Sequence, residues 1–338
     1  MSALVLGIES SCDETAASVV SDGRTILSSV VHSQASLHAR YGGVVPEIAG
    51  RSHLAQIMPV IESALAEARV GLRDLDCIAV TTRPGLIGSL LIGVNAAKAL
   101  AWSLSMPIVG VHHIEAHVYA ATMEHEPDPW PCLALVVSGG HSSLYRAVSP
   151  LQIECLGGTL DDAAGEAFDK VAHVLGLGYP GGPQVSKLAE QGNPRAVRLP
   201  IYSSGDGPPA FSFSGLKTAV LYHVRGPNMA RALPLPEEIP DRADIAASFE
   251  HALVQALISE TVRTALREGF TRVLVAGGVA CNRRLRQEMQ LRAASHGIAA
   301  LFPSPAYCTD NAAMIAGLGY HHWRAGHAAG LDLDASAR

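Results

Sequence analysis

The stretch Cys132–Val148, CLALVVSGGHSSLYRAV, decides the fold, because an apolar strand, a Gly-Gly turn and a return strand follow one another directly. The same order occurs near the start of the chain, where Leu4–Val20 reads LVLGIESSCDETAASVV. A third strand is predicted after each pair, over Thr25–Val31 in the first half and Gln152–Leu156 in the second. The chain therefore carries a duplicated arrangement of strands.

Helices and strands alternate after each group of three strands. In the first half we predict helices over Pro46–Val70, Ile87–Leu104 and Ile114–Met123, separated by the strands Cys77–Thr81 and Pro107–Val111. After an insertion over about 158–240, the second half continues with a helix over Ala243–Glu268, a strand over Arg272–Ala276 and a helix over Ala280–Ala294. A strand over Ile298–Phe302 and a helix from Asn311 follow. This pattern predicts an α/β protein of two duplicated lobes, each a mixed sheet flanked by helices. We place the lobes at 1–125 and 126–310, with the helix from about 311 packing back on the first lobe.

Composition narrows the class of protein. The 338 residues are 48% hydrophobic and 17% charged, which is typical of compact globular domains. No apolar run approaches the roughly 18 to 20 uninterrupted residues of a membrane span, and the N-terminus lacks the basic start of a secretory signal. We therefore expect a cytoplasmic protein without a membrane, with its six cysteines reduced because they form no CxxC pair.

The net charge of −6 argues against broad nonspecific binding of nucleic acid, which relies on excess Lys and Arg. A polynucleotide partner would need a local basic patch. The candidates are four arginines at 283, 284, 286 and 292, for which a solvated helix face is the commoner role.

A candidate metal site begins at Val111–His117, VHHIEAH. His113 and His117 are four residues apart, so on a helix both rings lie on one face, as two ligands of one metal require. The best third ligand is Asp310, where another helix begins after an apolar strand. Such a histidine pair also arises by chance in a chain with 15 histidines. The pattern is not HExxH, because Glu115 lies midway between the histidines instead of following the first.

Two turns predict a phosphate site. Val137–His141, VSGGH, places two glycines and a serine at a strand-to-strand turn, where backbone N–H groups can approach a phosphate without a Cβ clash. An ordinary hairpin turn is the alternative. The matching turn of the first half carries Asp13 and Glu14, which would need a cation, a water or an amine between them and such a ligand. Ordinary turn chemistry is the alternative there.

Four further segments are candidates for ligand contacts. Leu160–Lys170 is predicted to be a helix with Asp162, Glu166 and Asp169 on one side, and the Gly-Pro turn Gly176–Pro183, which contains Gly182, could approach a ribose or base. Phe211–Thr218 suits a strand edge or an ordered substrate loop. In Val273–Asn282 small residues could form a wall for adenine, beside the hydrogen-bonding side chain of Asn282. A solvated helix face and surface turns are the alternatives, and Gly192–Pro240, with GDGPPA and PLPEEIP, is predicted to be rich in loops.

With these motifs in family order, the chain resembles the TsaD family of tRNA threonylcarbamoyl transferases, formerly called O-sialoglycoprotein endopeptidases. The resemblance spans nearly the whole chain and rests on GIESSCDETAASVV, YGGVVPEIAGRSH, RPGLIGSLLIG, HHIEAH, VSGGHSSL, DDAAGEAFDKVAHVLGLGYPGGP, FSFSGLKT, VAGGVACNRRLR and CTDNAAMIA. It implies the two-lobed fold of actin, Hsp70 and sugar kinases. It also implies transfer of the threonylcarbamoyl group from threonylcarbamoyl-AMP to N6 of the adenosine that follows the anticodon in tRNAs reading ANN codons.

The resemblance also implies particular sites. Metal ligands fall on His113, His117 and Asp310, with Fe(2+) favoured and Zn(2+) possible, and nucleotide-binding positions fall on Val136–Gly140, Asp169, Gly182 and Asn282. We assign Asp13 and Glu14 to orienting or deprotonating the incoming amine. Some relatives have a tyrosine ligand where this chain has Val136, so the fourth metal ligand stays open. Implied partners are tRNA, a TsaB-type paralogue and a TsaE-type ATPase, with adenylate made by a TsaC-type enzyme.

Three other functions stay open on the sequence. A metalloprotease is suggested by the older family name and the paired histidines, but the H-x-E-x-H order speaks against it. A sugar kinase or ATPase shares the implied fold. A nucleotide-binding scaffold within an assembly is the non-enzymatic alternative.

Overall fold

The computed structural model describes residues 2–226 and 239–338. They form two compact units. The first comprises Met1–Pro129, Val148–Ile153 and Pro303–Arg338, and the second comprises Trp130–Ala147 and Glu154–Phe302. Segment 303–310, which we had placed with the second lobe, thus groups with the first unit.

The first unit is built on a five-stranded sheet in the order β3-β2-β1-β4-β5. Its strands are β1 (Leu4–Glu9), β2 (Glu14–Ser21), β3 (Thr25–Ser33), β4 (Cys77–Arg83) and β5 (Ile108–His112). The first three pair antiparallel, while β4 pairs parallel with both β1 and β5. β1 is apolar throughout its middle and buried on both faces, which requires helices on both sides of the sheet.

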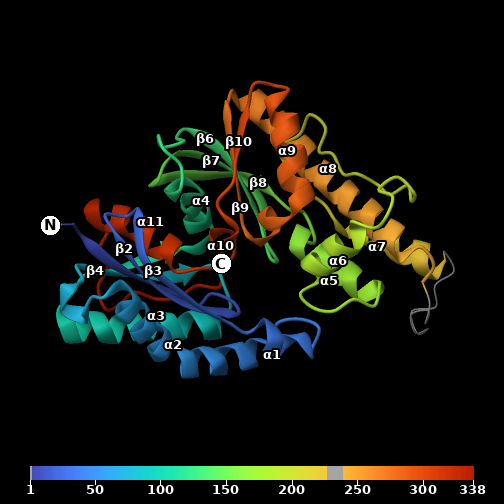
Figure 1. The fold of residues 1–338 in the computed structure, drawn as a ribbon. Helices are drawn as coiled ribbons and strands as arrows, with labels where there is room; N and C mark the ends of the chain where they lie inside the picture. The colour runs from blue at the N-terminus through green and yellow to red at the C-terminus, as the bar shows by residue number, and fades with distance from the viewer. Residues whose placement is uncertain (1, 227–238) are drawn as a thin grey trace. The chain divides into compact units, whose positions relative to one another are not determined.

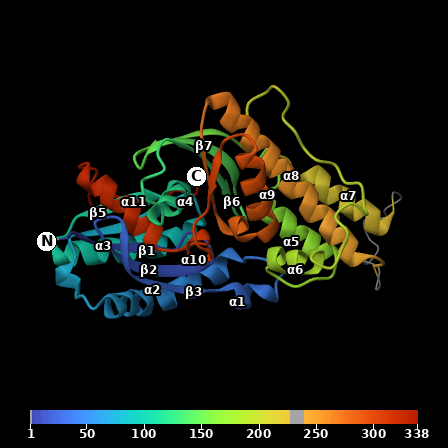
Figure 2. The same ribbon diagram turned by 45° about the horizontal axis from the view of Figure 1, so that its top comes forward.

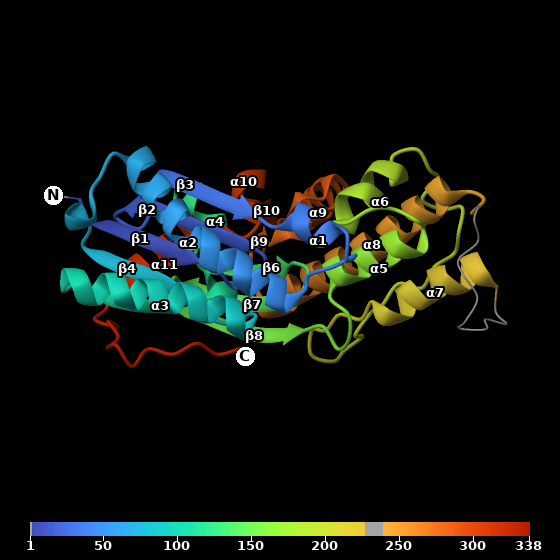
Figure 3. The same ribbon diagram turned by 90° about the horizontal axis from the view of Figure 1, so that it is seen from below.

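Helices α2 (Pro46–Ala68) and α3 (Ile87–Leu104) cover one face of this sheet, as Figure 3 shows. Helices α4 (His113–Met123) and α11 (Ala313–Arg324) contact it from the other face (Figure 2). Gly7 explains how closely α11 approaches, because a Cβ on Gly7 would lie 2.2 Å from the carbonyl oxygen of Ala312. This close packing holds the chain next to Asp310 against the centre of the sheet.

The second unit repeats the arrangement with the strand order β10-β9-β6-β7-β8. Its strands are β6 (Cys132–Val137), β7 (Ser142–Ser149), β8 (Gln152–Gly158), β9 (Arg272–Ala276) and β10 (Ala299–Leu301). β6 pairs antiparallel with β7 and parallel with β9. The long helix α8 (Arg242–Glu268) packs on α9 (Arg283–Ala294) and on the helices of the insertion, visible in Figure 1 as α5 (Ala164–Val174), α6 (Gly181–Ala189) and α7 (Ser214–Arg225). The predicted fold class is confirmed.

Several predicted boundaries were wrong. The helix predicted over Leu160–Lys170 begins only at Ala164, so Asp162 precedes it, although Asp162 and Glu166 both pair with Lys170. The reason is that Asp161 and Asp162 bond to the start of α7 and to α5. Asp161 accepts hydrogen bonds from the hydroxyls of Ser212, just before α7, and Ser214, and Asp162 forms ion pairs with Lys170 of α5 and Lys217 of α7.

Other differences lie at short elements. Residues 214–225, predicted to be loop, form α7, and Phe211 forms an isolated bridge with Thr159. The helix predicted from Ala280 begins at Arg283, after a 3₁₀ turn over Gly278–Cys281. Helix α1 (Ala35–Ala39) was not predicted. Most of the PLPEEIP stretch lies outside the described residues.

One described helix, α3, is long and apolar enough by length and composition to cross a membrane. Core helices of globular proteins pass the same test, and α3 packs on α2 and β4.

Candidate metal centre and nucleotide-binding turns

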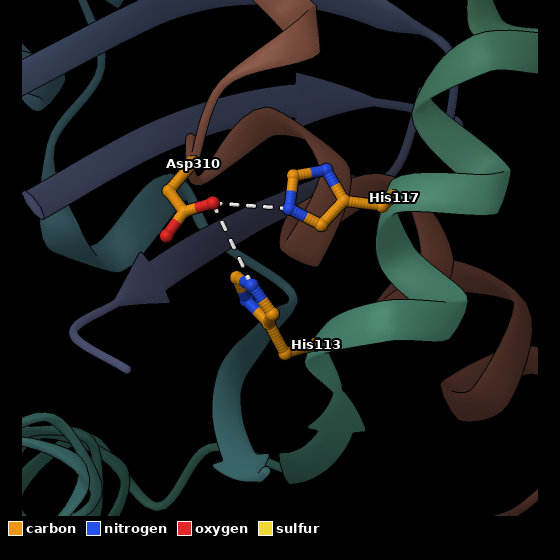
Figure 4. A group of neighbouring side chains, drawn as sticks. All are labelled: His113, His117 and Asp310. Carbon is orange, nitrogen blue, oxygen red and sulfur yellow. Dashed lines mark hydrogen bonds and ion pairs between the residues drawn. The ribbon is translucent and has the colours of Figure 1, made fainter. Parts of the chain in front are cut away.

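The two histidines and Asp310 converge within the first unit. His113 and His117 lie one turn apart on α4, and their rings meet edge to face at 4.7 Å between centroids. Asp310 Oδ1 lies 3.0 Å from His117 Nε2 and 3.6 Å from His113 Nε2, between the two rings (Figure 4). All three ligand atoms lie within 4.8 Å of one another. Two imidazole nitrogens and one carboxylate oxygen form a donor set that suits a divalent metal and leaves positions open.

Local structure sets these side chains in place. The ring of His112, at the end of β5, accepts hydrogen bonds through Nδ1 from the backbone N–H groups of Ile114 and Glu115, at 3.2 and 3.5 Å, and so caps α4. Asn311 accepts from Met314 N and donates to the carbonyl of Thr309, which fixes the turn that carries Asp310. The start of the helix that carries the two histidines and the turn that carries Asp310 are thus each held by hydrogen bonds from a side chain to the backbone.

The electrostatics of the cluster favour a cation. Burial lowers the pKa of His113, but the negative charges of Glu9 and Asp310 outweigh it and raise this pKa to about 9. Burial also raises the pKa of Glu14 to about 9, with Asp310 and Asp13 adding to the effect. The negative charges of Glu9 and Asp310 thus favour positive charge at His113, whereas the raised pKa keeps Glu14 protonated at neutral pH.

Asp13 lies in the turn between β1 and β2, and Glu14 is the first residue of β2, in the same unit as the histidines. The hydroxyl of Ser33 donates to Glu14 at 3.0 Å, and the backbone N–H of Gln34 donates to the carbonyl of Asp13. The structure thus brings the predicted turns after β1 and β5 into one region of the first unit.

His53, which the sequence analysis did not single out, holds this turn from helix α2. It is fully buried, with Nδ1 2.8 Å from the hydroxyl of Thr15 and Nε2 2.9 Å from the carbonyl of Cys12. Nε2–H therefore donates to Cys12, while Nδ1 accepts from Thr15. These contacts bracket Asp13 and Glu14 on both sides.

Replacing His53 with Phe is expected to destabilise the protein by roughly 1–3 kcal/mol, because the buried Thr15 hydroxyl and the Cys12 carbonyl lose their partner. Burial lowers the pKa of His53, so below about pH 6.5 the unfolded state binds a proton that the folded state resists. The wild type should therefore lose stability as pH falls from 7 to 5, and His53→Phe should lose less. Urea unfolding at both pH values measures this, and equal pH slopes for the two proteins would contradict it.

The proposed nucleotide-binding residues lie in the second unit. Val136 and Val137 are buried in β6, and the Ser138–Gly140 turn is closed by the Ser138 N–H donating to the carbonyl of His141. A Cβ on Gly139 or Gly140 would meet nothing within 4 Å, so this backbone is open to a ligand. The turns after β6 and β9 lie side by side, since a Cβ on Gly277 would lie 2.3 Å from the carbonyl oxygen of Val137.

The other three positions have distinct surroundings. Asp169 accepts a hydrogen bond from Gly181 N at 2.7 Å, and Gly182 faces open space. Asn282 caps α9 through Leu285 N, and its amide nitrogen donates to Ser186 and Glu250. The side-chain amide of Asn282 is therefore already hydrogen-bonded to other residues of the protein.

Of the arginines in the candidate basic patch on α9, Arg284 is neutralised by carboxylates. Arg284 pairs with Glu250 and Glu288, and Arg283 lies 3.6 Å from Glu190. Arg286 stacks over the ring of Phe302 and donates to the carbonyl of Ala280.

Fold and site together define an actin-like α/β protein with a candidate metal centre in its first unit. Among solved structures, the chain is similar to HypF from T. kodakarensis, with a TM-score of 0.64 and 16% identity over 96% of this chain and 48% of that one. Component A of (R)-2-hydroxyglutaryl-CoA dehydratase from Acidaminococcus fermentans gives a TM-score of 0.55 and 15% identity over 94% and 98% of the two chains. At these identities the likeness shows the fold alone.

Sequence comparison gives the family. Residues 25–317 match the model of TsaD, tRNA N6-adenosine threonylcarbamoyltransferase. The proteins of that name from Symbiobacterium thermophilum and Geobacter sp. strain M21 are 54% and 53% identical over 332 residues, which is 98% of this chain and 95% of each relative. The chain belongs to the TsaD family.

Proposed function

We propose that this protein transfers the threonylcarbamoyl group from threonylcarbamoyl-AMP to N6 of the adenosine that follows the anticodon, in tRNAs reading ANN codons, with release of AMP. The observation that carries the proposal is the buried cluster of His113, His117 and Asp310 in a chain that is 54% identical to a tRNA N6-adenosine threonylcarbamoyltransferase. The name of these relatives supports group transfer over phosphorylation.

His113, His117 and Asp310 would hold one divalent metal, with Fe(2+) favoured over Zn(2+). When bound, that metal supplies Lewis-acid chemistry that can polarise the carbamoyl carbonyl and anchor the threonyl carboxylate. The protein's own part is to fix the ligands on α4 and on the Thr309–Asn311 turn, with both imidazoles buried from water.

The remaining residues would act on the amine and on the leaving group. The lone pair of N6 forms a bond to the carbamoyl carbon, and the bond from that carbon to the phosphate oxygen breaks with its electron pair going to AMP. Asp13 and Glu14 would orient or deprotonate the amine, and Glu14, whose pKa burial raises to about 9, can accept a proton only when it is ionised. The backbone N–H groups of Ser138–Gly140 would stabilise the phosphate of AMP, with Asp169, Gly182 and Asn282 contacting the rest of an adenylate or of ATP, ADP or AMP.

The net charge of −6 and the pairing of Arg284 with Glu250 and Glu288 support a need for partners that hold tRNA. We infer that a TsaB-type paralogue and a TsaE-type ATPase act with this chain in the cytoplasm, and that a TsaC-type enzyme supplies the adenylate.

One observation bears on the metalloprotease alternative. Glu115 lines a separate cavity of about 310 Å³, together with Arg83, His322 and His327, on another side of α4 from the metal ligands. A protease of the HExxH kind needs its glutamate beside the metal-bound water. The position of Glu115 therefore favours the transferase.

A reconstituted assay tests the proposal. Metal-loaded protein, the two partners, threonylcarbamoyl-AMP and an unmodified tRNA transcript should yield one AMP per modified adenosine. A transcript with guanosine in place of that adenosine is the matched control and should yield no modified tRNA. Metal-dependent cleavage of a sialoglycoprotein without any tRNA modification would overturn the proposal in favour of the protease.

A further inference from the structure

Glu9 is a fully buried carboxylate at the end of β1, next to the candidate metal centre. Its Oε1 accepts from Ser11 N at 2.5 Å, and its Oε2 accepts from the Thr81 hydroxyl at 2.7 Å. The same Oε2 lies 2.9 Å from Nδ1 of His113. A charged side chain is rarely buried unless it is paired, and these three contacts are the partners of the buried Glu9 carboxylate.

The contacts fix which nitrogen of His113 carries a proton. A backbone N–H can only donate, and the Thr81 hydroxyl also donates to the carboxylate, so both oxygens of Glu9 act as acceptors. Two groups face the Nδ1 of His113, the Glu9 carboxylate at 2.9 Å and the Ser11 hydroxyl at 3.2 Å, and the nearer, charged acceptor places the ring hydrogen on Nδ1. Its other nitrogen, Nε2, faces Asp310 at 3.6 Å and supplies the metal-binding lone pair.

His117 differs, because no group in the described part of the chain holds its ring through Nδ1 as Glu9 holds that of His113. Its Nε2 lies 3.0 Å from Asp310, but its Nδ1 is buried and has no hydrogen-bond partner among the residues that the structure describes. When Nε2 binds a metal, the ring proton must lie on Nδ1, where nothing accepts it. The two histidines therefore differ in how well the protein prepares them as ligands.

We propose that Glu9 is a positioning residue that fixes the orientation and the protonated nitrogen of His113, and that it makes His113 the better prepared of the two histidine ligands. The inference rests on the metal site of the proposed function. Carboxylate partners of this kind orient a metal-bound histidine and raise the basicity of its ligating nitrogen. Glu9 itself touches neither the metal position nor the proposed substrate.

Zinc binding by the whole protein tests the proposal without reference to activity. Glu9→Gln keeps the shape of the side chain, and we expect it to bind Zn(2+) about 10 to 100-fold more weakly than the wild type, as measured by competition with a chromogenic chelator. The matched control is Thr81→Val, which removes a donor to Glu9 but leaves the contact between Glu9 and His113. We expect its affinity to fall less than about tenfold.

The outcomes separate this inference from the proposed function. A wild-type protein that binds no zinc sinks both the metal site and the inference. Equal zinc affinities for folded Glu9→Gln and the wild type sink the inference alone, as does an equal loss in Thr81→Val.

A second measurement covers the case in which Glu9→Gln does not fold. In the zinc-loaded wild type, nitrogen-detected NMR of the imidazole rings, assigned with His113→Gln, should show a hydrogen on Nδ1 of His113. A hydrogen on Nε2 with a bare Nδ1 would overturn the proposal.

Discussion

Asp310→Ala is expected to lower threonylcarbamoyl transfer by about a hundredfold or more, because metal catalysis of this kind supplies several kcal/mol. The substitution removes the one carboxylate ligand, which lies 3.0 Å from His117 and 3.6 Å from His113. Metal content should fall together with activity, so plasma emission analysis of the purified variant is measured beside the transfer assay.

The matched control for this variant is Asp332→Ala, an exposed aspartate near the C-terminus in the same unit. It should retain both metal and activity. If Asp310→Ala kept a full complement of metal and transferred at the wild-type rate, the assignment of the metal centre would be wrong.

The duplicated fold could be predicted because its signals are periodic. The apolar strands β1 and β6, each followed by a polar or glycine turn and a return strand, appear in the sequence as they do in the structure. The start of α5 could not be predicted, because Asp161 and Asp162 bond to residues about 50 positions further along the chain. Local periodicity contains no information about such partners.

The convergence of His113, His117 and Asp310 could be predicted from spacing and residue type, but the groups that hold these side chains could not. A glutamate that ends an apolar strand, as Glu9 does, was the available signal, since it must find partners once buried. The partners Thr81 and His113 lie 72 and 104 positions away. His53 gave no signal at all, because one histidine in an amphipathic helix is compatible with many roles.

Asp13→Asn and Glu14→Gln are each expected to reduce the transfer rate by roughly 10²- to 10⁴-fold if the residue positions or deprotonates the amine. Both substitutions keep the size of the side chain, and a glutamine at 14 can still accept the hydrogen bond from Ser33. The loss should therefore report the missing carboxylate and not a collapsed turn. The rate of modified-adenosine formation under single-turnover conditions measures it, since that excludes product release.

The metal content of each variant distinguishes a carboxyl group that binds the metal from one that acts on the amine. Asp13→Asn should keep its metal, because Asp13 is not among the three converging ligands, whereas Asp310→Ala should lose it. Glu47→Gln, an exposed change on α2 of the same unit, is the control for removing a carboxylate. If the double variant Asp13→Asn/Glu14→Gln transferred as fast as Glu47→Gln, neither carboxyl group could be the base. The proton of N6 would then have to leave to water or to a group of the leaving adenylate, and the metal centre with the Ser138–Gly140 turn would have to account for catalysis.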